Sequence, residues 1–159
     1  MNKRIFHIPN NNGFTLTELI MVLVLISIVA TIALPRFFGR DSFDQRALFD
    51  DTLNAVRYSQ KLAVATGCKI RITFDGNQFE LLHENSCGND SFSTELAVKH
   101  PADPDQAYTG SQTNVVITAA NSSTTFNALG QAEANNTVII GNHQLSIIAE
   151  TGFSYDSSS

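Results

Sequence analysis

Glu18 is the residue whose setting says most about the chemistry available to this chain. It is the only charged residue between Phe14 and Leu34, and the sixteen residues that follow it are uncharged. An ionisable side chain inside such an apolar stretch is costly and is by default a functional residue with a partner. We therefore expect Glu18 to make a specific electrostatic contact. The alternative is a glutamate that lies near lipid headgroups by chance.

Two cysteines, Cys68 and Cys87, are spaced so that they could form a disulfide. In an oxidising compartment they would close a loop of about 20 residues, worth roughly 3 kcal/mol by loop entropy. The spacing suits a disulfide across one hairpin, and the alternative is two free buried thiols. No histidine accompanies them at ligand spacing, so we expect no metal site.

Motifs for catalysis are missing from the sequence, which has no nucleophile elbow, no phosphate-binding loop and no histidine pair at helical metal-binding spacing. His83, His100 and His143 are scattered, and we expect them on the surface or in strands. Asp103 and Asp105 could contribute to a calcium site, but a solvated acidic loop is the stronger interpretation. We expect no enzymatic activity, no cofactor and no small-molecule substrate.

The stretch that carries Glu18 is long enough to cross a membrane as a helix. Residues 14–34 number 21, and at about 1.5 Å per residue they cover the roughly 30 Å apolar core of a bilayer. A secretory signal would have a shorter apolar run followed by a small residue, whereas Gly13 precedes this run. Residues 1–13 are short, basic and rich in helix-breaking residues, so we expect them to be a leader peptide.

The sequence GFTLTE at residues 13–18, followed by an apolar helix, resembles the leader junction of type IV pilins and type II secretion pseudopilins. The resemblance implies that a prepilin peptidase on the cytoplasmic face cuts between Gly13 and Phe14 and N-methylates the new amino terminus at Phe14. Glu18 then becomes the fifth mature residue, where the family keeps a glutamate. Pro35 becomes the twenty-second, where the family often keeps a proline.

The resemblance also implies a partner for Glu18, namely the Phe14 ammonium of a neighbouring subunit. The alternative is a pair within one helix, where residues 14 and 18 would share a face. Charge alone does not orient the span, because basic residues flank it on both sides. The peptidase places the leader inside and everything after Gly39 in the periplasm.

Three parts follow from this interpretation: a leader at 1–13, a transmembrane and assembly half of the helix at 14–38, and a periplasmic globular domain at 41–159. We expect a single-pass inner-membrane protein that later joins a pilus fibre. Pro35 should kink the long helix or start a new segment. Positions 48–63 then form an amphipathic helix with Asp50, Asn54, Arg57 and Lys61 on its polar side, and Gly67 is the expected C-cap.

A sheet should follow this helix. Residues 68–74 alternate inward and outward, and Asp75-Gly76 predicts a turn into a strand at 78–83. We expect loops at 84–94 and 99–114 around a short strand at 96–98, then strands at 115–119, 124–126, 137–140 and 145–150. The fold class is α+β, a long N-terminal helix packed on an antiparallel β-sheet domain, as in the type IV pilin fold.

Residues 125–130 and 145–152 are similar to the paired strands of H-type minor pilins and pseudopilins. With residues 54–67, they most resemble the C-type minor pilin of mannose-sensitive haemagglutinin (MSHA) pili. This resemblance implies a minor pilin that joins or primes a pilus through bundled apolar helices. The alternative is an H-type pseudopilin of a type II secretion system. Expected partners are the prepilin peptidase, other pilin or pseudopilin subunits, and the inner membrane before assembly.

The charge balance argues against DNA binding, which some H-type minor pilins perform. Without the leader, eight basic residues remain against fifteen acidic ones, and residues 101–159 contain no Lys or Arg. Nucleic-acid affinity needs such side chains to neutralise phosphates, and only Lys69, Arg71 and Lys99 are available on the distal domain. We expect no nucleic-acid partner. A membrane-tethered enzyme or adhesin is the remaining alternative.

Overall fold

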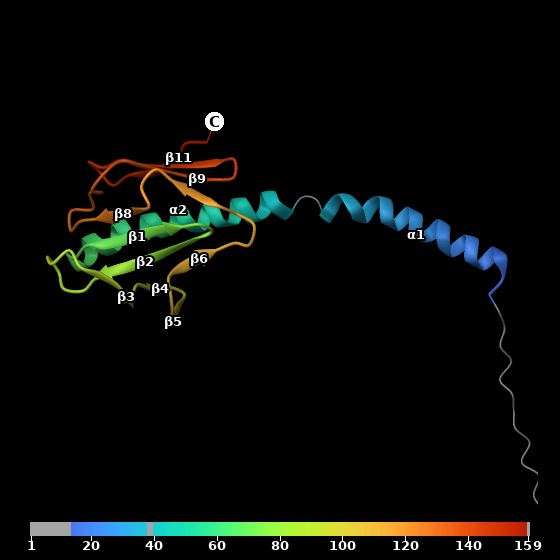
Figure 1. Ribbon diagram of the computed structural model, residues 1–159, viewed down its shortest axis with the longest axis horizontal. Coiled ribbons are helices and arrows are strands. Elements are labelled where there is room, and N and C mark those ends of the chain that lie inside the picture. The colour runs from blue at the N-terminus through green and yellow to red at the C-terminus, as the bar shows by residue number, and fades with distance from the viewer. Residues whose placement is uncertain (1–13, 38–39, 159) are drawn as a thin grey trace, which may run out of the picture. The chain divides into compact units, whose positions relative to one another are not determined.

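Two helices and eleven strands make up the part of the chain that the computed structural model describes (Figure 1). The backbone is described for residues 14–37 and 40–158, and the side chains for 14–31, 41–93 and 96–158. The chain divides into two compact units, Met1–Gly39 and Arg40–Ser159. The first contains α1, Leu16–Phe37, and the second contains α2, Arg40–Thr66, and all the strands. The predicted leader lies outside the described residues.

The amphipathic pattern predicted for residues 48–63 is confirmed in α2. Its inward face is buried and its polar face, with Asn54, Arg57 and Lys61, is exposed. Two buried hydroxyls on the inward face, those of Thr52 and Ser59, donate to the backbone carbonyls one turn earlier at 2.7 and 2.8 Å. The apolar face can therefore carry small polar residues without leaving them unsatisfied.

Gly67 ends α2 as the sequence predicts. It adopts a left-handed conformation with φ of 71°, and its N–H donates to the carbonyl of Ala63 at 2.9 Å. A glycine is suited to this C-cap position because it has no β-carbon to clash. The chain then turns back at once to pack a sheet against the helix.

The hairpin predicted after the helix is present as β1, Ile70–Asp75, and β2, Gln78–Glu84, joined at Asp75-Gly76. Alternate β1 residues are buried, as a half-buried strand requires. A five-stranded antiparallel sheet grows from this hairpin in the order β3-β2-β1-β8, and β6 also pairs with β2. The added strands are β3, Phe92–Ala97, β6, Thr109–Ser111, and β8, Ser123–Phe126.

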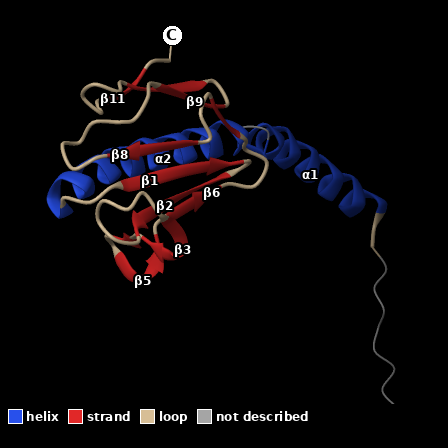
Figure 2. Cartoon of the chain, turned by 60° about the vertical axis from the view of Figure 1, so that its left-hand side comes forward, coloured by secondary structure: helices blue, strands red, loops and turns tan. Residues whose placement is uncertain are grey.

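A second antiparallel sheet has the order β11-β10-β9-β7. Its strands are β7, Ile117–Ala119, β9, Asn136–Ile140, β10, His143–Ile147, and β11, Ser154–Asp156. Two short strands, β4, Lys99–His100, and β5, Asp103–Ala107, pair only with each other. Figures 1 and 2 show α2 lying along β1 and β8, with the β9 to β11 strands over another side of the helix, in agreement with the packing of α2 against both sheets.

One core joins the helix to both sheets. Its fully buried large side chains come from α2, the hairpin and the second sheet: Leu48, Phe49, Val56, Ile70, Ile72, Phe79, Leu81, Phe126, Ile140, Leu145 and Ile147. The expected fold class, a helix packed on an antiparallel sheet domain, is confirmed.

Gln60 on α2 connects two turns that belong to different sheets. Its side-chain amide donates to the carbonyl of Gly130, after β8, at 3.1 Å and to that of Thr151, after β10, at 2.8 Å. Gly152 lies directly against the Gly130 carbonyl, with no room for a β-carbon. The segments 125–130 and 145–152 thus lie in separate sheets and meet at their turns rather than as paired strands.

Several predicted loops and strand ends were wrong. β3 begins at Phe92, inside the predicted loop 84–94, and β4, β5 and β6 lie within 99–114. These strands are short and lack alternation, and their places depend on tertiary contacts. Gly110 of β6 touches the ring of Phe79 so closely that no β-carbon would fit, and Pro104 is tolerated because β5 is an edge strand. The strand predicted at 145–150 ends at Ile147, and β11 was not predicted.

Candidate functional site: the start of the N-terminal helix

Phe14 and Thr15 lie outside the helix that carries Glu18. α1 begins at Leu16, and the Thr15 hydroxyl accepts a hydrogen bond from the Glu18 N–H at 3.2 Å. This is the contact of an N-cap residue with the third helical residue. Thr15-Leu16-Thr17-Glu18 also has the spacing of a capping box, Thr-x-x-Glu, which is the sequence signal for this helix start.

The helix start changes the geometry expected for Glu18. The argument for a pair within one helix placed residues 14 and 18 on the same helical face, but Phe14 precedes the helix by two residues. That pair therefore loses its geometric basis. Glu18 is exposed in the first turn of α1, where the helix dipole stabilises a carboxylate.

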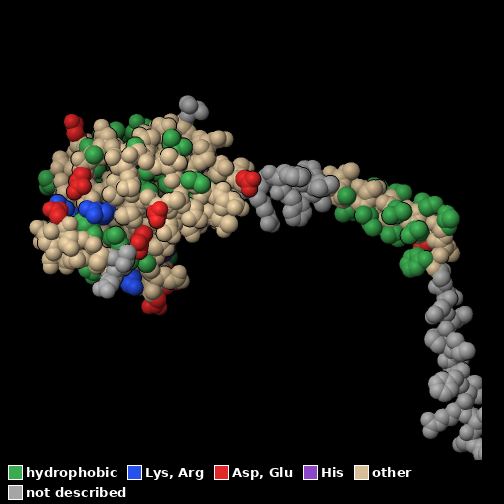
Figure 3. Space-filling view, viewed as in Figure 1, with side chains coloured by type: hydrophobic (Ala, Val, Ile, Leu, Met, Phe, Trp, Pro, Cys, Tyr) green, Lys and Arg blue, Asp and Glu red, His purple; other side chains and the backbone are tan. Residues whose placement is uncertain are grey.

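Apart from Thr17, Glu18, Ser27 and Thr31, the described side chains of α1 are apolar, and nearly all are exposed. Figure 3 shows apolar side chains along the face of α1 in view. Two hydroxyls in the middle of this stretch donate back to the helix: Ser27 to the carbonyl of Val24 and Thr31 to that of Ile28, each at 2.7 Å. A helix that is apolar all round needs an apolar environment, in lipid or among other helices. Exposed large side chains on it include Leu19, Ile20, Met21, Val22, Leu23, Val24, Leu25, Ile26, Ile28 and Val29.

Within the part of the chain that the structure describes, none of the helices combines the length and the apolar character needed to cross a membrane.

Pro35 does not end α1, contrary to one of the two outcomes expected for it. The helix passes through Pro35 to Phe37, and the next helix begins at Arg40. A proline removes one backbone donor, and a helix can continue for a short distance past that loss. Within the described residues, α1 therefore continues past the proline. Gly13 lies outside the described residues.

The disulfide between Cys68 and Cys87 is present, with the two Cα atoms 4.8 Å apart. It connects the start of β1 to the loop after β2, as expected for a bridge across the hairpin. Lys69, next to Cys68, forms an ion pair with Asp90 in the same loop, and this hydrogen-bonded carboxylate raises the pKa of Lys69. The predicted disulfide is confirmed.

Glu84, the last residue of β2, stabilises this loop in a way that the sequence analysis missed. Its side chain is 1% exposed, and its carboxylate accepts from the N–H of Lys69 at 3.1 Å and from that of Asp90 at 2.7 Å. Burial raises the pKa of Glu84, but the backbone N–H donors of the loop lower it by more, so the pKa lies below its ordinary value. A glutamate at the end of a strand gives no sequence signal for such a role.

The remaining candidate residues do not assemble into a site. His83, His100 and His143 lie in β2, β4 and β10, and His100 packs edge-on against Tyr108 with ring centroids 4.6 Å apart. Asp103 accepts from the N–H of Asp105 at 3.2 Å in a local turn. Over the described residues, no three His, Cys, Asp or Glu side chains are grouped so that they could hold a metal ion.

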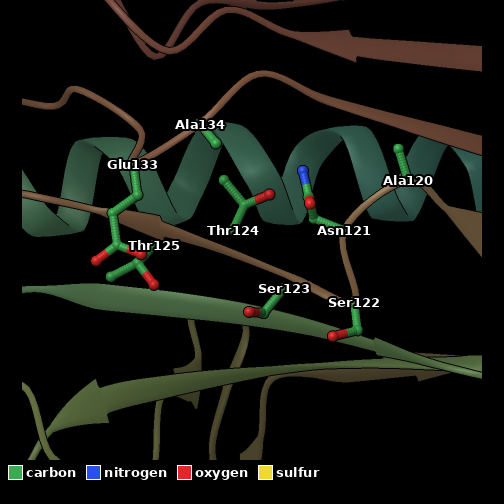
Figure 4. A pocket seen from close by; sticks show the side chains of 8 residues that line it. All are labelled: Ala120, Asn121, Ser122, Ser123, Thr124, Thr125, Glu133 and Ala134. Carbon is green, nitrogen blue, oxygen red and sulfur yellow. The ribbon is translucent and has the colours of Figure 1, made fainter.

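A polar hollow of about 480 Å³ lies between β8 and the segment that leads into β9 (Figure 4). Buried Asn136 is bonded to two of the lining residues: its amide group donates to the Asn121 carbonyl and the Thr124 hydroxyl, both at 2.9 Å, and accepts from the Asn121 N–H at 2.9 Å. All its hydrogen-bonding groups are used within the protein. The lining residues are Ala120, Asn121, Ser122, Ser123, Thr124, Thr125, Glu133 and Ala134.

The three cationic residues considered for nucleic acid do not form a free basic surface. Lys69 is paired with Asp90. The Arg71 guanidinium lies over the Phe92 ring, 3.9 Å from its centroid, and donates to the Thr125 hydroxyl at 3.1 Å. Lys99 is exposed on β4.

Comparisons with known proteins found one similarity at the N-terminus and one in the overall fold. Residues 8–34 match the prokaryotic N-terminal methylation motif, a stretch that contains Gly13, Phe14 and Glu18. A comparison with curated protein sequences found no match.

Two crystal structures of the type IV minor pilin FimU from Pseudomonas aeruginosa are similar to this chain. One, in space group P21, has 16% sequence identity and a TM-score of 0.51, and the alignment covers 76% of this chain and 92% of that chain. The other, in space group P65, has 16% identity and a TM-score of 0.48, with 73% and 91% covered. The former shows that the chain has the fold of a type IV pilin. The expected fold and the expected N-terminal methylation motif are confirmed, whereas similarity to MSHA pilins in particular stays a prediction.

Proposed function

We propose that this chain, which has the N-terminal methylation motif and the type IV pilin fold, is a non-enzymatic minor pilin. It enters the inner membrane as a single-pass prepilin, is cut between Gly13 and Phe14, and is N-methylated at Phe14. It is then assembled into a type IV pilus of the MSHA-like kind, or primes one. The observation that carries this proposal is the methylation motif at residues 8–34, which includes most of the apolar helix α1.

The geometry at the start of α1 supports processing at this position. Thr15 caps the helix, and Phe14 lies outside it. The peptide bond proposed for cleavage therefore adjoins non-helical chain, whose backbone groups are not already engaged in the hydrogen bonds of a helix. If the helix extended back through Phe14, the backbone next to the cleaved bond would be helical and less accessible to the peptidase.

Glu18 is proposed to pair with the Phe14 ammonium of a neighbouring subunit. Because Phe14 lies outside the helix, the pair within one chain has no helical geometry to support it. An exposed carboxylate on an otherwise apolar surface is costly to bury without a cation. The contact would therefore select one axial register for helices that pack side by side. Pro35 lies in the assembly half of α1, and its role there is part of the same proposal.

Mass spectrometry of the mature N-terminus tests the processing step. In cells with an active prepilin peptidase, we expect a chain that begins with N-methylated Phe14. A Gly13→Ala variant should accumulate as the longer, unmethylated form. A first residue other than N-methylated Phe14 in the wild-type protein would remove the basis of the proposal.

A Glu18→Ala variant tests assembly separately from membrane insertion. We expect the variant to reach the membrane and to be absent from sheared fibres, because the helix loses its one charged contact. Glu133→Ala, which removes an exposed glutamate from the second unit, is the matched control and should assemble normally. Equal incorporation of both variants would count against the role of Glu18.

The alternative machine, a type II secretion system, would use the same helix in the same way. Deletion of the chain distinguishes the two. Loss of surface fibres with normal protein secretion supports the pilus, and the opposite result supports a pseudopilin.

A further inference from the structure

The two cysteines of the bridge differ in their exposure. Cys68, between α2 and β1, is 6% exposed, whereas Cys87 lies in the exposed loop that joins β2 to β3. A disulfide is formed or opened when a thiolate attacks a sulfur, so the rate depends on access to that sulfur. Cys87 is therefore the end of the bridge that a thiol or a disulfide from outside the chain can reach.

The Glu84 carboxylate joins the two chain segments that carry these cysteines. Its Oε2 accepts from the N–H of Lys69, the residue after Cys68, at 3.1 Å. Its Oε1 accepts from the N–H of Asp90, three residues after Cys87, at 2.7 Å. The Glu84 side chain is buried, and hydrogen bonds to a charged group are stronger where water is excluded. These contacts hold the two segments together independently of the S–S bond.

Other contacts of the loop favour the same conformation. The N–H of Asn85 donates to the carbonyl of Ser91 at 2.8 Å, which closes the base of the loop. Asp90 has a left-handed backbone, with φ of 55°, which is unfavourable for a residue that has a β-carbon. Its hydrogen bond to Glu84 and its ion pair with Lys69 stabilise that conformation.

We propose that Cys87 is the sulfur at which thiol–disulfide exchange with an external reagent begins, and that Glu84 is a positioning residue that holds it next to Cys68. In the reduced chain, the Cys87 thiolate attacks an external disulfide, here oxidised glutathione, to form a mixed disulfide and release one glutathione. The Cys68 thiolate then attacks the Cys87 sulfur and releases the second glutathione. The two cysteines thereby lose two electrons and two protons, and the two released glutathione thiols gain them.

The carboxylate is suited to this role because each of its two oxygens serves one segment. The amide in Glu84→Gln has one oxygen and one NH₂ group, and the NH₂ group cannot accept from a backbone N–H. One segment would then lose its contact, and the cysteines would lie together for a smaller fraction of the time. Because the second step of the exchange is intramolecular, the effective concentration of one thiol at the other falls with that fraction.

Equilibration of the full-length chain, in detergent, with defined ratios of reduced to oxidised glutathione measures this effective concentration. It should be lower in Glu84→Gln than in the wild type by at least about tenfold, because hydrogen bonds to a charged acceptor are lost. Glu80→Gln, which changes a half-buried glutamate on the same strand, is the matched control and should equal the wild type. Equal values for Glu84→Gln and the wild type would overturn the role of Glu84.

Hydrogen exchange separates the carboxylate contacts from the covalent bond. In Cys68→Ser/Cys87→Ser, the N–H of Asp90 should exchange at least about tenfold more slowly than in the same variant with Glu84→Gln added. Protected N–H groups in β1 show that both proteins are folded. Equally fast exchange of the Asp90 N–H in both folded proteins would show that the bridge alone holds the loop, contrary to the proposal.

The single-cysteine variants test which sulfur reacts first. Cys68→Ser keeps the exposed thiol and Cys87→Ser keeps the buried one. With oxidised glutathione, the mixed disulfide should form at least about tenfold faster in Cys68→Ser, because access limits the reaction of a thiol. Mass spectrometry of the glutathione adduct measures both rates. Equal rates, or a faster reaction in Cys87→Ser, would overturn the assignment of Cys87.

Discussion

Thr15 and Glu18 have different roles at the start of α1: one caps the helix and the other provides an exposed charge. The Thr15 hydroxyl accepts from the Glu18 N–H and fixes the first turn. The Glu18 carboxylate is left on the surface of that turn. The sequence contains the capping-box spacing, but the prediction from the apolar run placed the start of the helix at Phe14. Local hydrogen bonding, which a hydropathy pattern does not contain, decided the true start at Leu16.

Glu84 leads to a prediction about acid stability. Its folded pKa is lower than the ordinary value of 4.5, so the carboxylate stabilises the fold above that value, and this contribution is lost as the pH falls through the lower folded pKa. Glu84→Gln should lower the free energy of unfolding at pH 7 by about 1 to 3 kcal/mol, because an amide oxygen accepts less strongly from the backbone N–H donors.

Denaturant titrations of both proteins between about pH 3 and about pH 7, a range that includes the ordinary carboxyl pKa, measure this effect. The wild-type chain should lose stability steeply at the acid end, and the Gln variant should show a flatter profile. Parallel profiles would mean that the Glu84 carboxylate is not a charged acceptor in the folded protein.

At the scale of elements, the disulfide and the Glu84 contacts hold the same loop. Cys68→Ser/Cys87→Ser should lower the free energy of unfolding by about 3 kcal/mol, because the unfolded chain regains the entropy of an open loop. Reduction of the wild-type bridge should have the same effect. Chemical denaturation with and without reductant measures it, and unchanged midpoints would show that the loop is held by its hydrogen bonds alone.

How far the elements could be predicted depended on how each one is stabilised. α2 and the β1–β2 hairpin have regular burial patterns, and residues such as Leu48, Phe49 and Ile72 revealed them. β4, β5 and β6 have no such pattern, and the fit of Gly110 against the Phe79 ring becomes visible only in three dimensions. The pairing of Lys69 with Asp90 was hidden in the same way, although Cys68 and Cys87 already marked their loop.

At the scale of the whole molecule, the core belongs to one unit. All buried residues of the described chain lie between Leu48 and Ser154, and α1 contributes none. A fragment that begins at Asp41 should therefore fold, with a free energy of unfolding within about 0.5 kcal/mol of the full-length chain. Circular dichroism and denaturant titration of the two forms measure this. A fragment that lacks a cooperative transition would show that α1 is needed for the fold.

The apolar surface that α1 presents after Glu18, with Ser27 and Thr31 satisfied inside the helix, has a thermodynamic consequence. Lipid tails and aliphatic side chains are nearly equivalent solvents for such a helix, so exchanging one for the other changes its solvation free energy little. In the proposed function, assembly through α1 would then be close to reversible. The direction of the process must come from Glu18, whose surroundings do change, or from energy supplied by the machine that moves the subunit.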